Sequence, residues 1–318
     1  MTALLERSRR ARVMTRARRE DLQGSALVSP TVLVILLSSI LPLLAVVVFA
    51  FTEVRLIDIP RISMAKLTFT TENFTQLFAS PTFRSVLTTT VAYASMTTVG
   101  ALAFGTTVAL VLRRPFRGRS LVRALVLIPY VLPVVASATI WKQLLNPQYG
   151  LVNAVGAKFL GWDSPVAFLS TPTQQLLGLP VPVTLLVVTL FEIWKTAPLV
   201  FLFVTARLQV LPNELEESAA IDGAGPVARL RHIVLPQLRG VLLLLLLLRF
   251  IWSFQSFNDV FLLTRGAGGT EVLAVRVYTE LITRANIGSA SAYGLTMTAM
   301  LLVLLALYFL ANRRQEDS

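Results

Sequence analysis

Residues 213–237 read NELEESAAIDGAGPVARLRHIVLPQ, an acidic and alanine-rich stretch between two strongly apolar segments. Asn213 follows a proline and suits the N-cap of a helix. Three glutamates then fill the first turn, where the helix dipole favours negative charge: Glu214, Glu216 and Glu217. The alanines that come next are strong helix formers with little bulk, so another surface can approach this helix closely. The stretch therefore begins with a short polar helix.

A turn and a second helix complete this stretch. The run Asp222-Gly223-Ala224-Gly225 breaks the first helix, and Pro226 suits the first turn of the next. We expect the second helix to extend to about Val234, before Leu235-Pro236 ends it. Residues 213–237 are thus predicted to form two short helices joined by a tight turn.

The rest of the chain has the composition of a membrane protein. Its 318 residues are 55% hydrophobic and 14% charged, with a mean hydropathy of +0.70, whereas soluble domains carry about 25% charged residues. A helix of about 20 apolar residues crosses the hydrocarbon core of a bilayer. Six such spans are predicted, giving an all-α integral membrane protein: 26–51, 85–112, 121–142, 181–206, 240–263 and 287–311. We expect a bend in the third, around Pro129 in LIPYVLPVV.

Basic residues set the orientation of these spans. Of the 29 lysines and arginines, 18 lie in the N-terminal tail, the 113–123 loop, the 207–239 loop and the C-terminal tail, and nine lie in the opposite loops or, for Lys142, at the adjoining end of the third span. The side with the excess is cytoplasmic, so both termini are expected inside. The net charge of +12 is then a topology signal, and nucleic acid is not expected as a partner. We divide the chain into a basic tail (1–25), one six-span domain (26–311) and a second tail (312–318), and interpret the first span as retained rather than as a signal peptide.

Little in the sequence supports chemistry by the chain itself. It has no cysteine and a single histidine, His232, so thiol catalysis and a metal site are not expected. No GxxxxGK[ST] sequence is present to hold a nucleotide. Glu192 or Asp259 could serve a membrane enzyme, but carboxylates within spans more often serve structure or transport. We predict no catalytic residue and no cofactor.

The orientation places residues 213–237 in the cytoplasm, where two uses compete. The hairpin could dock on a partner protein, or it could lie as an amphipathic helix among lipid headgroups. Three glutamates in one turn argue against the second on an anionic leaflet. Contact with a partner protein is the favoured interpretation.

This segment resembles the "EAA" loop of bacterial ABC-importer permeases. The pattern is E-A-A, three residues, G, nine residues, and I-x-L-P. Here Glu217-Ser218-Ala219 is followed at these spacings by Gly223 and by Ile233-x-Leu235-Pro236, with Asp222 beside the glycine. Ser218 is the one departure, a small residue in place of a small residue. The resemblance implies the type I importer fold and makes this loop the coupling helix, which sits in a cleft of a cytoplasmic ATPase subunit.

The flanking sequence resembles the carbohydrate branch of the binding-protein-dependent transport family, the MalF/UgpA-like permeases. The similar segments cover most of the chain: ENFTQLFASPTFRSVLTTT, RGRSLVRALVLIPYVLPVVASATIWKQLLNPQYGLVNA, FEIWKTAPL and FLLTRGAGGTE. The resemblance implies a bacterial inner-membrane subunit that imports a carbohydrate. It also implies two ABC ATPase subunits, a sister permease and an extracytoplasmic sugar-binding protein as partners, with membrane lipid around the spans.

Four ionisable residues fall within or at the rim of predicted spans: Glu192, Lys195, Arg249 and Asp259. Such groups are costly in hydrocarbon and should face the bundle interior. Whether they bind substrate or only pair with one another is left open by the sequence.

Helical spacing brings some of them onto shared faces. Arg249, Ser253 and Ser256 follow one another at i, i+4 and i+7, with Trp252 on the border of the stripe. Glu192, Thr196 and Leu199 have the same spacing in the fourth span. The resemblance to the maltose permease places sugar-contacting positions at these six sites, although most side chains differ. Hydroxyl-rich substrates suit such polar groups, with tryptophan offering a flat apolar face.

Two other substrates or mechanisms stay open. Arg249 leaves room for an anionic sugar, glycerol phosphate or another small polar solute. A secondary transporter could instead use Glu192 or Asp259 as a proton relay, although inverted repeats and interrupted half-helices, common in such proteins, are not evident.

Overall fold

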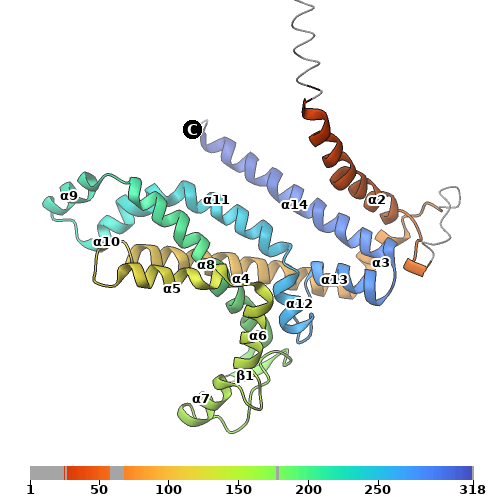
Figure 1. Cartoon of the computed structure of the whole chain (residues 1–318), viewed down its shortest axis with the longest axis horizontal. Helices are drawn as coiled ribbons and strands as arrows, with labels where there is room; N and C mark the ends of the chain where they lie inside the picture. The colour runs from red at the N-terminus through yellow and green to blue at the C-terminus, as the bar shows by residue number, and fades with distance from the viewer. Residues whose placement is uncertain (1–24, 26, 58–67, 177–178, 317–318) are drawn as a thin grey trace, which may run out of the picture.

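The computed structural model describes residues 25, 27–57, 68–176 and 179–316. It is built of helices and one small hairpin (Figure 1). The predicted tail 1–25 lies outside the described residues except for its last position. The predicted tail 312–318 is helical as far as Glu316, because the last helix continues beyond the expected end of the sixth span.

Five helices in the described part of the chain are long and apolar enough to cross a membrane. They match five of the six predicted spans: Leu27–Ala50, α4 (Pro81–Val111), α8 (Val183–Val210), Pro226–Phe254 and, within α14 (Ile287–Glu316), Ile287–Leu310. The first contains a π-helical turn η1 (Leu36–Ile40) followed by α2 (Leu41–Ala50). Within these helices the prediction of apolar spans is confirmed.

The third predicted span is two helices rather than one. Helices α5 (Arg119–Val131) and α6 (Val134–Leu144) meet at an angle of 100°. The expected bend therefore exists, but it lies at Pro133. Leu132, which precedes this proline, has an extended backbone with ψ of 136°, the conformation that a following proline imposes. Pro129, by contrast, lies buried inside α5.

Helices α4, α8 and α11 (Leu235–Phe254) form the central layer of the molecule (Figure 1). Glycines let α4 approach α8 closely. A Cβ atom built on Gly105 would lie 2.6 Å from the backbone oxygen of Ala197. One on Gly100 would lie 2.2 Å from Ile193 Cδ1. Close approach through small residues is how membrane helices gain packing contacts without a hydrophobic driving force between them.

The predicted fifth span, 240–263, is wrong as one continuous helix. Helix α11 ends at Phe254, and a short helix α12 (Asn258–Thr264) follows after a break. At the other end, α11 continues without interruption from α10 (Pro226–Arg229) through a π-helical turn, η4 (Leu230–Val234). The membrane helix is therefore displaced toward the 213–237 segment.

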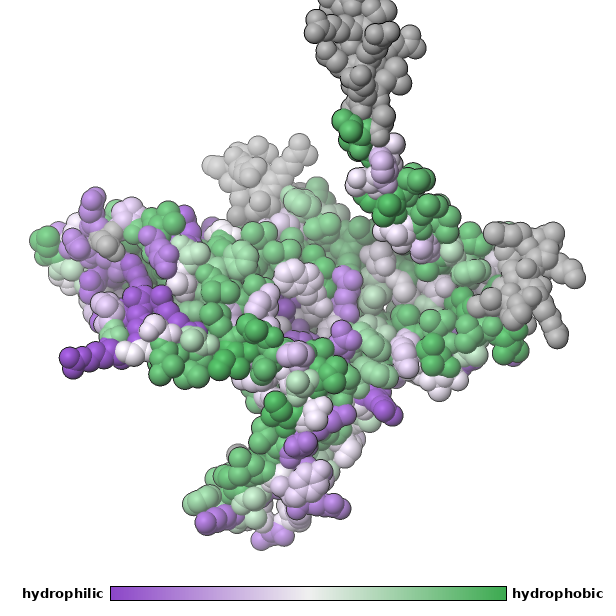
Figure 2. Space-filling model, in the orientation of Figure 1, coloured by the Kyte–Doolittle hydropathy of each residue, from purple (hydrophilic) through white to green (hydrophobic). Residues whose placement is uncertain are grey.

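Apart from the 213–237 segment, the remaining elements are short and lie in the loops predicted on the side opposite the basic loops. They are α3 (Glu72–Ala79), α7 (Leu151–Phe159), the antiparallel pair β1 (Gln174–Leu176) and β2 (Leu179–Val181), α13 (Leu273–Tyr278) and the π-helical turn η5 (Thr279–Thr283). Helix α13 packs on α14 and α4. Figure 2 shows an apolar surface along much of the helical bundle and hydrophilic residues gathered at the end that carries α10 and the start of α5.

Candidate functional site

The 213–237 segment forms a helical hairpin at one end of the bundle (Figure 1). Its first helix is α9 (Asn213–Ile221). Two residues after the end of this helix, Gly223 has a left-handed backbone conformation with φ of +83°. The Ala224 amide donates to the Ala219 carbonyl at 2.8 Å, and the Gly223 amide donates to that of Ala220 at 3.1 Å. This pair of bonds is the Schellman C-cap, which favours glycine because other residues are strained at positive φ.

The helix boundaries differ from two expectations. Helix α9 begins at Asn213, so the N-cap is Pro212 rather than Asn213. Leu235-Pro236 does not end the second helix. A π-helical turn, closed by a hydrogen bond from the Leu235 amide to the Leu230 carbonyl, precedes the proline, and the chain continues into α11. Two predicted coupling residues, Leu235 and Pro236, are therefore the first residues of α11 and lie within the continuous helix Pro226–Phe254.

The hairpin presents a free surface made of the residues that the motif singled out. Glu217, Ser218 and Asp222 are exposed, and Ala219 is half-buried. Among the large apolar side chains of the hairpin, Ile221 and Val227 are the most exposed, at 88% and 76%. Ile233, half-buried, lies at the base of the hairpin.

One anchor of the hairpin was not predicted. Glu216 of α9 forms an ion pair with Arg113, the second residue after the end of α4. The arginine-rich 113–123 loop and the hairpin therefore meet at the same end of the molecule. Sequence spacing gave no signal for this contact, since the two residues are 103 positions apart.

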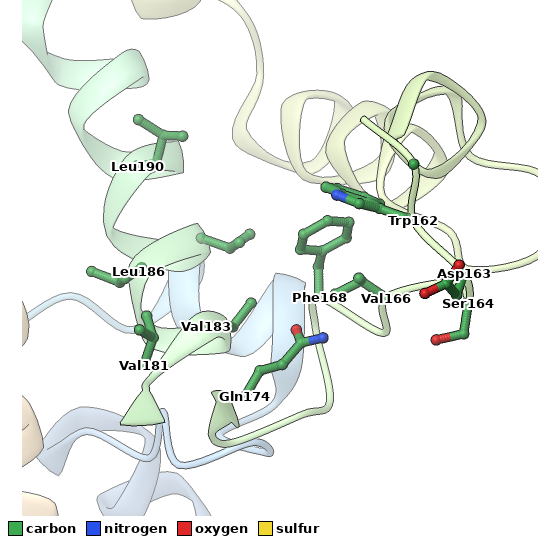
Figure 3. A pocket seen from close by; sticks show the side chains of 12 residues that line it. Trp162, Asp163, Ser164, Val166, Phe168, Gln174, Val181, Val183, Leu186 and Leu190 are labelled. Atoms are coloured by element: carbon green, nitrogen blue, oxygen red, sulfur yellow. The ribbon is translucent and has the colours of Figure 1, made fainter. Parts of the chain in front are cut away.

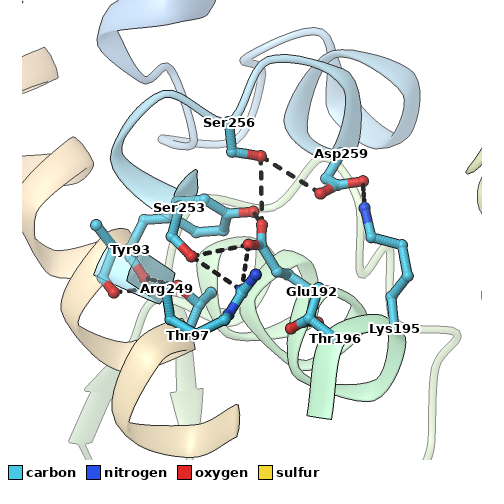
Figure 4. A network of polar contacts seen from close by, with 10 residues as sticks. Tyr93, Thr97, Glu192, Lys195, Thr196, Arg249, Ser253, Ser256 and Asp259 are labelled. Carbon is cyan, nitrogen blue, oxygen red and sulfur yellow. Dashed lines mark hydrogen bonds and ion pairs between the residues drawn. The ribbon is translucent and has the colours of Figure 1, made fainter. Parts of the chain in front are cut away.

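A buried cluster of charged and hydroxyl groups joins α4, α8, α11 and α12 (Figure 4). Its centre is the Glu192 carboxylate, which is 2% exposed. Arg249 Nη2 lies 2.8 Å from Glu192 Oε1 and 3.1 Å from Ser253 Oγ. Ser253 Oγ also donates to Glu192 Oε1 at 2.8 Å, and the Tyr93 hydroxyl donates to Glu192 Oε2. Both carboxylate oxygens are thus engaged.

A second ion pair adjoins the first. Lys195 Nζ contacts Asp259 Oδ1. Ser256 links the two pairs, because its hydroxyl lies 3.3 Å from Glu192 Oε2 and 3.4 Å from Asp259 Oδ2. Two carboxylates face one guanidinium and one ammonium group, so the cluster is neutral overall. The four ionisable residues therefore pair with one another in this conformation.

The structure gathers most, but not all, of the predicted pathway residues. Thr196 is buried next to Glu192 and donates its hydroxyl to the Glu192 backbone carbonyl at 2.7 Å. Leu199 is half-buried further along α8. Trp252 lies outside the cluster, with half of its surface exposed. Ser256 joins the cluster from the break after α11 rather than from a continuing helix.

Tyr93 is the member of the cluster that sequence reasoning missed. It lies on α4, is fully buried, and donates to the carboxylate at the centre. A tyrosine in a threonine-rich span has many possible neighbours, so only the packing of α4 on α8 reveals its partner. Its role follows from chemistry, since a buried phenol needs a hydrogen-bond acceptor.

A separate cavity of about 540 Å³ lies between the 160–181 segment and the start of α8 (Figure 3). Trp162 and Phe168 form one wall, with ring centroids 5.8 Å apart, and Leu186 and Leu190 form the other. Asp163 and other polar residues lie at its edge. None of the predicted pathway residues lines this cavity.

The family follows from a match over most of the chain. Residues 101–317, which include α8, the hairpin and the charge cluster except Tyr93, match the model of the binding-protein-dependent transport system inner membrane component. The chain belongs to this family. The match confirms that it is an inner-membrane transport protein and supports the resemblance drawn from the coupling motif.

Relatives within the family include permeases of sugar transporters. The chain is 32% identical over 224 residues to the trehalose/maltose transport system permease protein MalF of Thermococcus litoralis, covering 70% of this chain and 71% of that protein. It is 30% identical over 243 residues to the inner membrane ABC transporter permease protein YcjO of Escherichia coli, covering 76% and 78%. A third relative, 30% identical over 247 residues and covering 77% of each chain, is the sulfoquinovosyl glycerol transport system permease protein SmoG of Agrobacterium fabrum.

The fold is that of a known transporter. The chain resembles one from a bacterial ABC transporter involved in the import of the acidic polysaccharide alginate, with a TM-score of 0.79 and 21% identity. The alignment covers 95% of this chain and 99% of the other. At this identity the likeness establishes the overall fold.

Proposed function

We propose that this chain is the membrane-spanning permease subunit of an ATP-driven carbohydrate importer. It forms the translocation pathway with a sister permease, receives substrate from an extracytoplasmic binding protein, and is driven by two ATPase subunits. The hairpin is the observation that supports this proposal most strongly. The residues of the coupling motif form a capped pair of helices, and the exposed face of this pair includes Glu217 and Ile221. The chain supplies no catalytic group of its own in this proposal.

The same proposal includes six spans with both termini in the cytoplasm. Helices α5 and α6 then count as one bent span. The ion pair between Arg113 and Glu216 supports a common side for the arginine-rich loop and the hairpin. Since basic loops stay cytoplasmic, this side faces the ATPases. The outer segments with α3, α7 and α13 then face the binding protein.

The charge cluster favours a neutral carbohydrate as substrate. Arg249 is the residue whose charge, from sequence alone, made an anionic substrate possible. In the structure its charge is neutralised by Glu192, and it is hydrogen-bonded to Ser253. An anionic sugar would need a cation without a carboxylate partner, and Lys195 is paired as well. The hydroxyls of Tyr93, Ser253 and Ser256 can exchange partners with sugar hydroxyls without leaving a charge unpaired. The relative named for trehalose and maltose agrees with this substrate class, whereas the transporter that shares the fold is named for the acidic polysaccharide alginate.

Charge reversal at Glu217 tests the coupling assignment. Glu217→Lys should reduce ATP-dependent uptake at least tenfold, because a repelled or misplaced hairpin no longer transmits the ATPase cycle, and a tenfold loss needs only about 1.4 kcal/mol. Uptake and ATPase activity are measured on the complete importer in proteoliposomes.

Glu72→Lys is the matched control for that experiment. Glu72 is, like Glu217, an exposed glutamate of a short helix, α3, but it lies at the other end of the bundle. Wild-type uptake by Glu217→Lys with the ATPase still bound would exclude the coupling role of this residue. Equal loss in both variants would assign the effect to general charge reversal.

A further inference from the structure

A cavity of about 330 Å³ lies where the end of α4 meets the hairpin. Its floor is apolar and is formed by Leu110 of α4 together with Leu230 and Val234 of the π-helical turn. Its remaining lining is mainly charged: Arg113, Arg114, Arg229 and Glu216. The cavity is therefore amphipathic and predominantly cationic, in the hydrophilic region visible at the α10 end of the molecule in Figure 2.

The positive charge of this cavity is only partly compensated. Glu216 is the one carboxylate of the lining, and it pairs with Arg113. Within the described residues, no ion pair reaches Arg114 or Arg229. The Nε atom of Arg229 is buried and has no hydrogen-bond partner there. A buried donor without a partner is costly, so the cavity is suited to a ligand that brings acceptor oxygens.

The position of the cavity along the membrane helices indicates the kind of ligand that it binds. The cavity lies where the apolar helix Pro81–Val111 ends and Pro226–Phe254 begins. Val111, also in the lining, is 66% exposed and extends the apolar floor toward the surface of the bundle. The boundary of a membrane helix is the level of lipid headgroups. A ligand here can place an anionic group on the arginines and an acyl chain along α4.

We propose that this cavity binds the phosphate of an anionic phospholipid in the leaflet that faces the ATPases. The arginine guanidinium groups present paired donors that match phosphate oxygens. Basic pockets between helices on the cytoplasmic side are suited to anionic headgroups. The leaflet assignment rests on the orientation in the proposed function, whereas the binding of phosphate does not.

The site would connect lipid composition to coupling. A phosphate bound by Arg114 and Arg229 joins the end of α4 to α10, and it lies next to the Arg113–Glu216 pair that holds α9. Occupancy then fixes the hairpin relative to the central helices. The lipid acts as a positioning ligand for the surface that meets the ATPase.

Lipid binding to the purified full-length chain tests this proposal without requiring transport. Delipidated protein in neutral detergent is titrated with phosphatidylglycerol, with phosphatidylcholine and with inorganic phosphate, and bound ligand is counted by native mass spectrometry. The double variant Arg114→Gln/Arg229→Gln should bind phosphatidylglycerol about twenty-five-fold more weakly, a factor of about five for each arginine removed. Arg114→Lys/Arg229→Lys, which keeps the charge, should retain most of the binding.

Arg231→Gln is the control. Arg231 is an exposed arginine of the π-helical turn η4, two residues after Arg229, and it does not line the cavity. It should bind phosphatidylglycerol as wild type does. Equal affinity of the glutamine double variant and Arg231→Gln would overturn the proposal. Stronger binding of inorganic phosphate than of phosphatidylglycerol, lost in the double variant, would overturn the lipid assignment and give the site to a soluble anion. Failure of uptake in the complete importer would not affect these binding results.

Discussion

At the scale of single residues, Glu192 carries the most interactions in the charge cluster. It accepts from Arg249, Ser253, Ser256 and Tyr93 while almost fully buried. Removing one partner of such a pair leaves a charge without compensation in a medium that solvates it poorly. The cluster should therefore behave as one unit, in which single substitutions cost more than the paired substitution.

Arg249→Met should destabilise the protein by about 3–5 kcal/mol, because Glu192 is left without its cation. The double variant Glu192→Gln/Arg249→Met should recover part of this loss, since the neutral amide still bonds with Tyr93 and Ser253. Apparent unfolding temperatures of the detergent-purified chain, measured at one heating rate, provide the comparison.

Arg284→Met is the control for this cycle. Arg284 also pairs with a buried carboxylate, Glu280, but its own side chain is 56% exposed, and exposed pairs contribute only about 0–1 kcal/mol. An Arg249→Met protein that unfolds at the wild-type temperature would contradict the account, as would a double variant no more stable than Arg249→Met.

At the scale of elements, the predicted spans have two breaks in the described part of the chain, one between α5 and α6 and one between α11 and α12. The α5–α6 bend could be expected from sequence, because LIPYVLPVV contains two prolines, although which of them bends the chain could not. The hairpin boundaries were predicted to within a residue at Gly223 and Pro226, where backbone preferences are local. The continuation through Pro236 was not, because a π-helical turn depends on how the helix packs at the end of the bundle.

The break between α11 and α12 shows the limit of periodicity. Residues 255–257 contain neither glycine nor proline, so nothing local ends the helix there. In the structure, Ser256 contacts Glu192 and Asp259 pairs with Lys195. Tertiary contacts of this kind are invisible to a helical pattern, which nevertheless grouped Arg249 and Ser253 correctly.

The closeness of α4 and α8 predicts a size limit at Gly105. Gly105→Ala should destabilise the chain by about 1–3 kcal/mol, because its Cβ would lie 2.6 Å from the Ala197 carbonyl oxygen and 2.7 Å from Val200 Cβ. Thermal unfolding in detergent measures the effect.

Gly294→Ala on α14 is the matched control, since a Cβ there meets nothing within 4 Å. It should be neutral or stabilising by up to about 1 kcal/mol through the higher helix propensity of alanine. Gly105→Ala with unchanged stability would mean that α4 and α8 are not packed as closely as described.

At the scale of the whole molecule, a polar hairpin and a buried charge cluster lie on the same helices. Helix α8 carries Glu192 and leads into α9, while α11 carries Arg249 and begins at the base of the hairpin. In the proposed function, these two helices would transmit a displacement of the hairpin to the residues that hold the cluster together. The motif and the span lengths predicted these components from sequence, but the contacts of Tyr93 and Arg113, and the outward position of Trp252, required the packed structure.

The energy source of transport tests the central claim most directly. The chain is reconstituted in proteoliposomes with its sister permease, ATPase subunits and binding protein, and uptake of the ligand that co-purifies with the binding protein is followed with a radiolabel. The account predicts uptake that requires ATP on the ATPase side and persists when a protonophore collapses the proton gradient. Uptake driven by a proton gradient through the chain alone, without the ATPases, would contradict it.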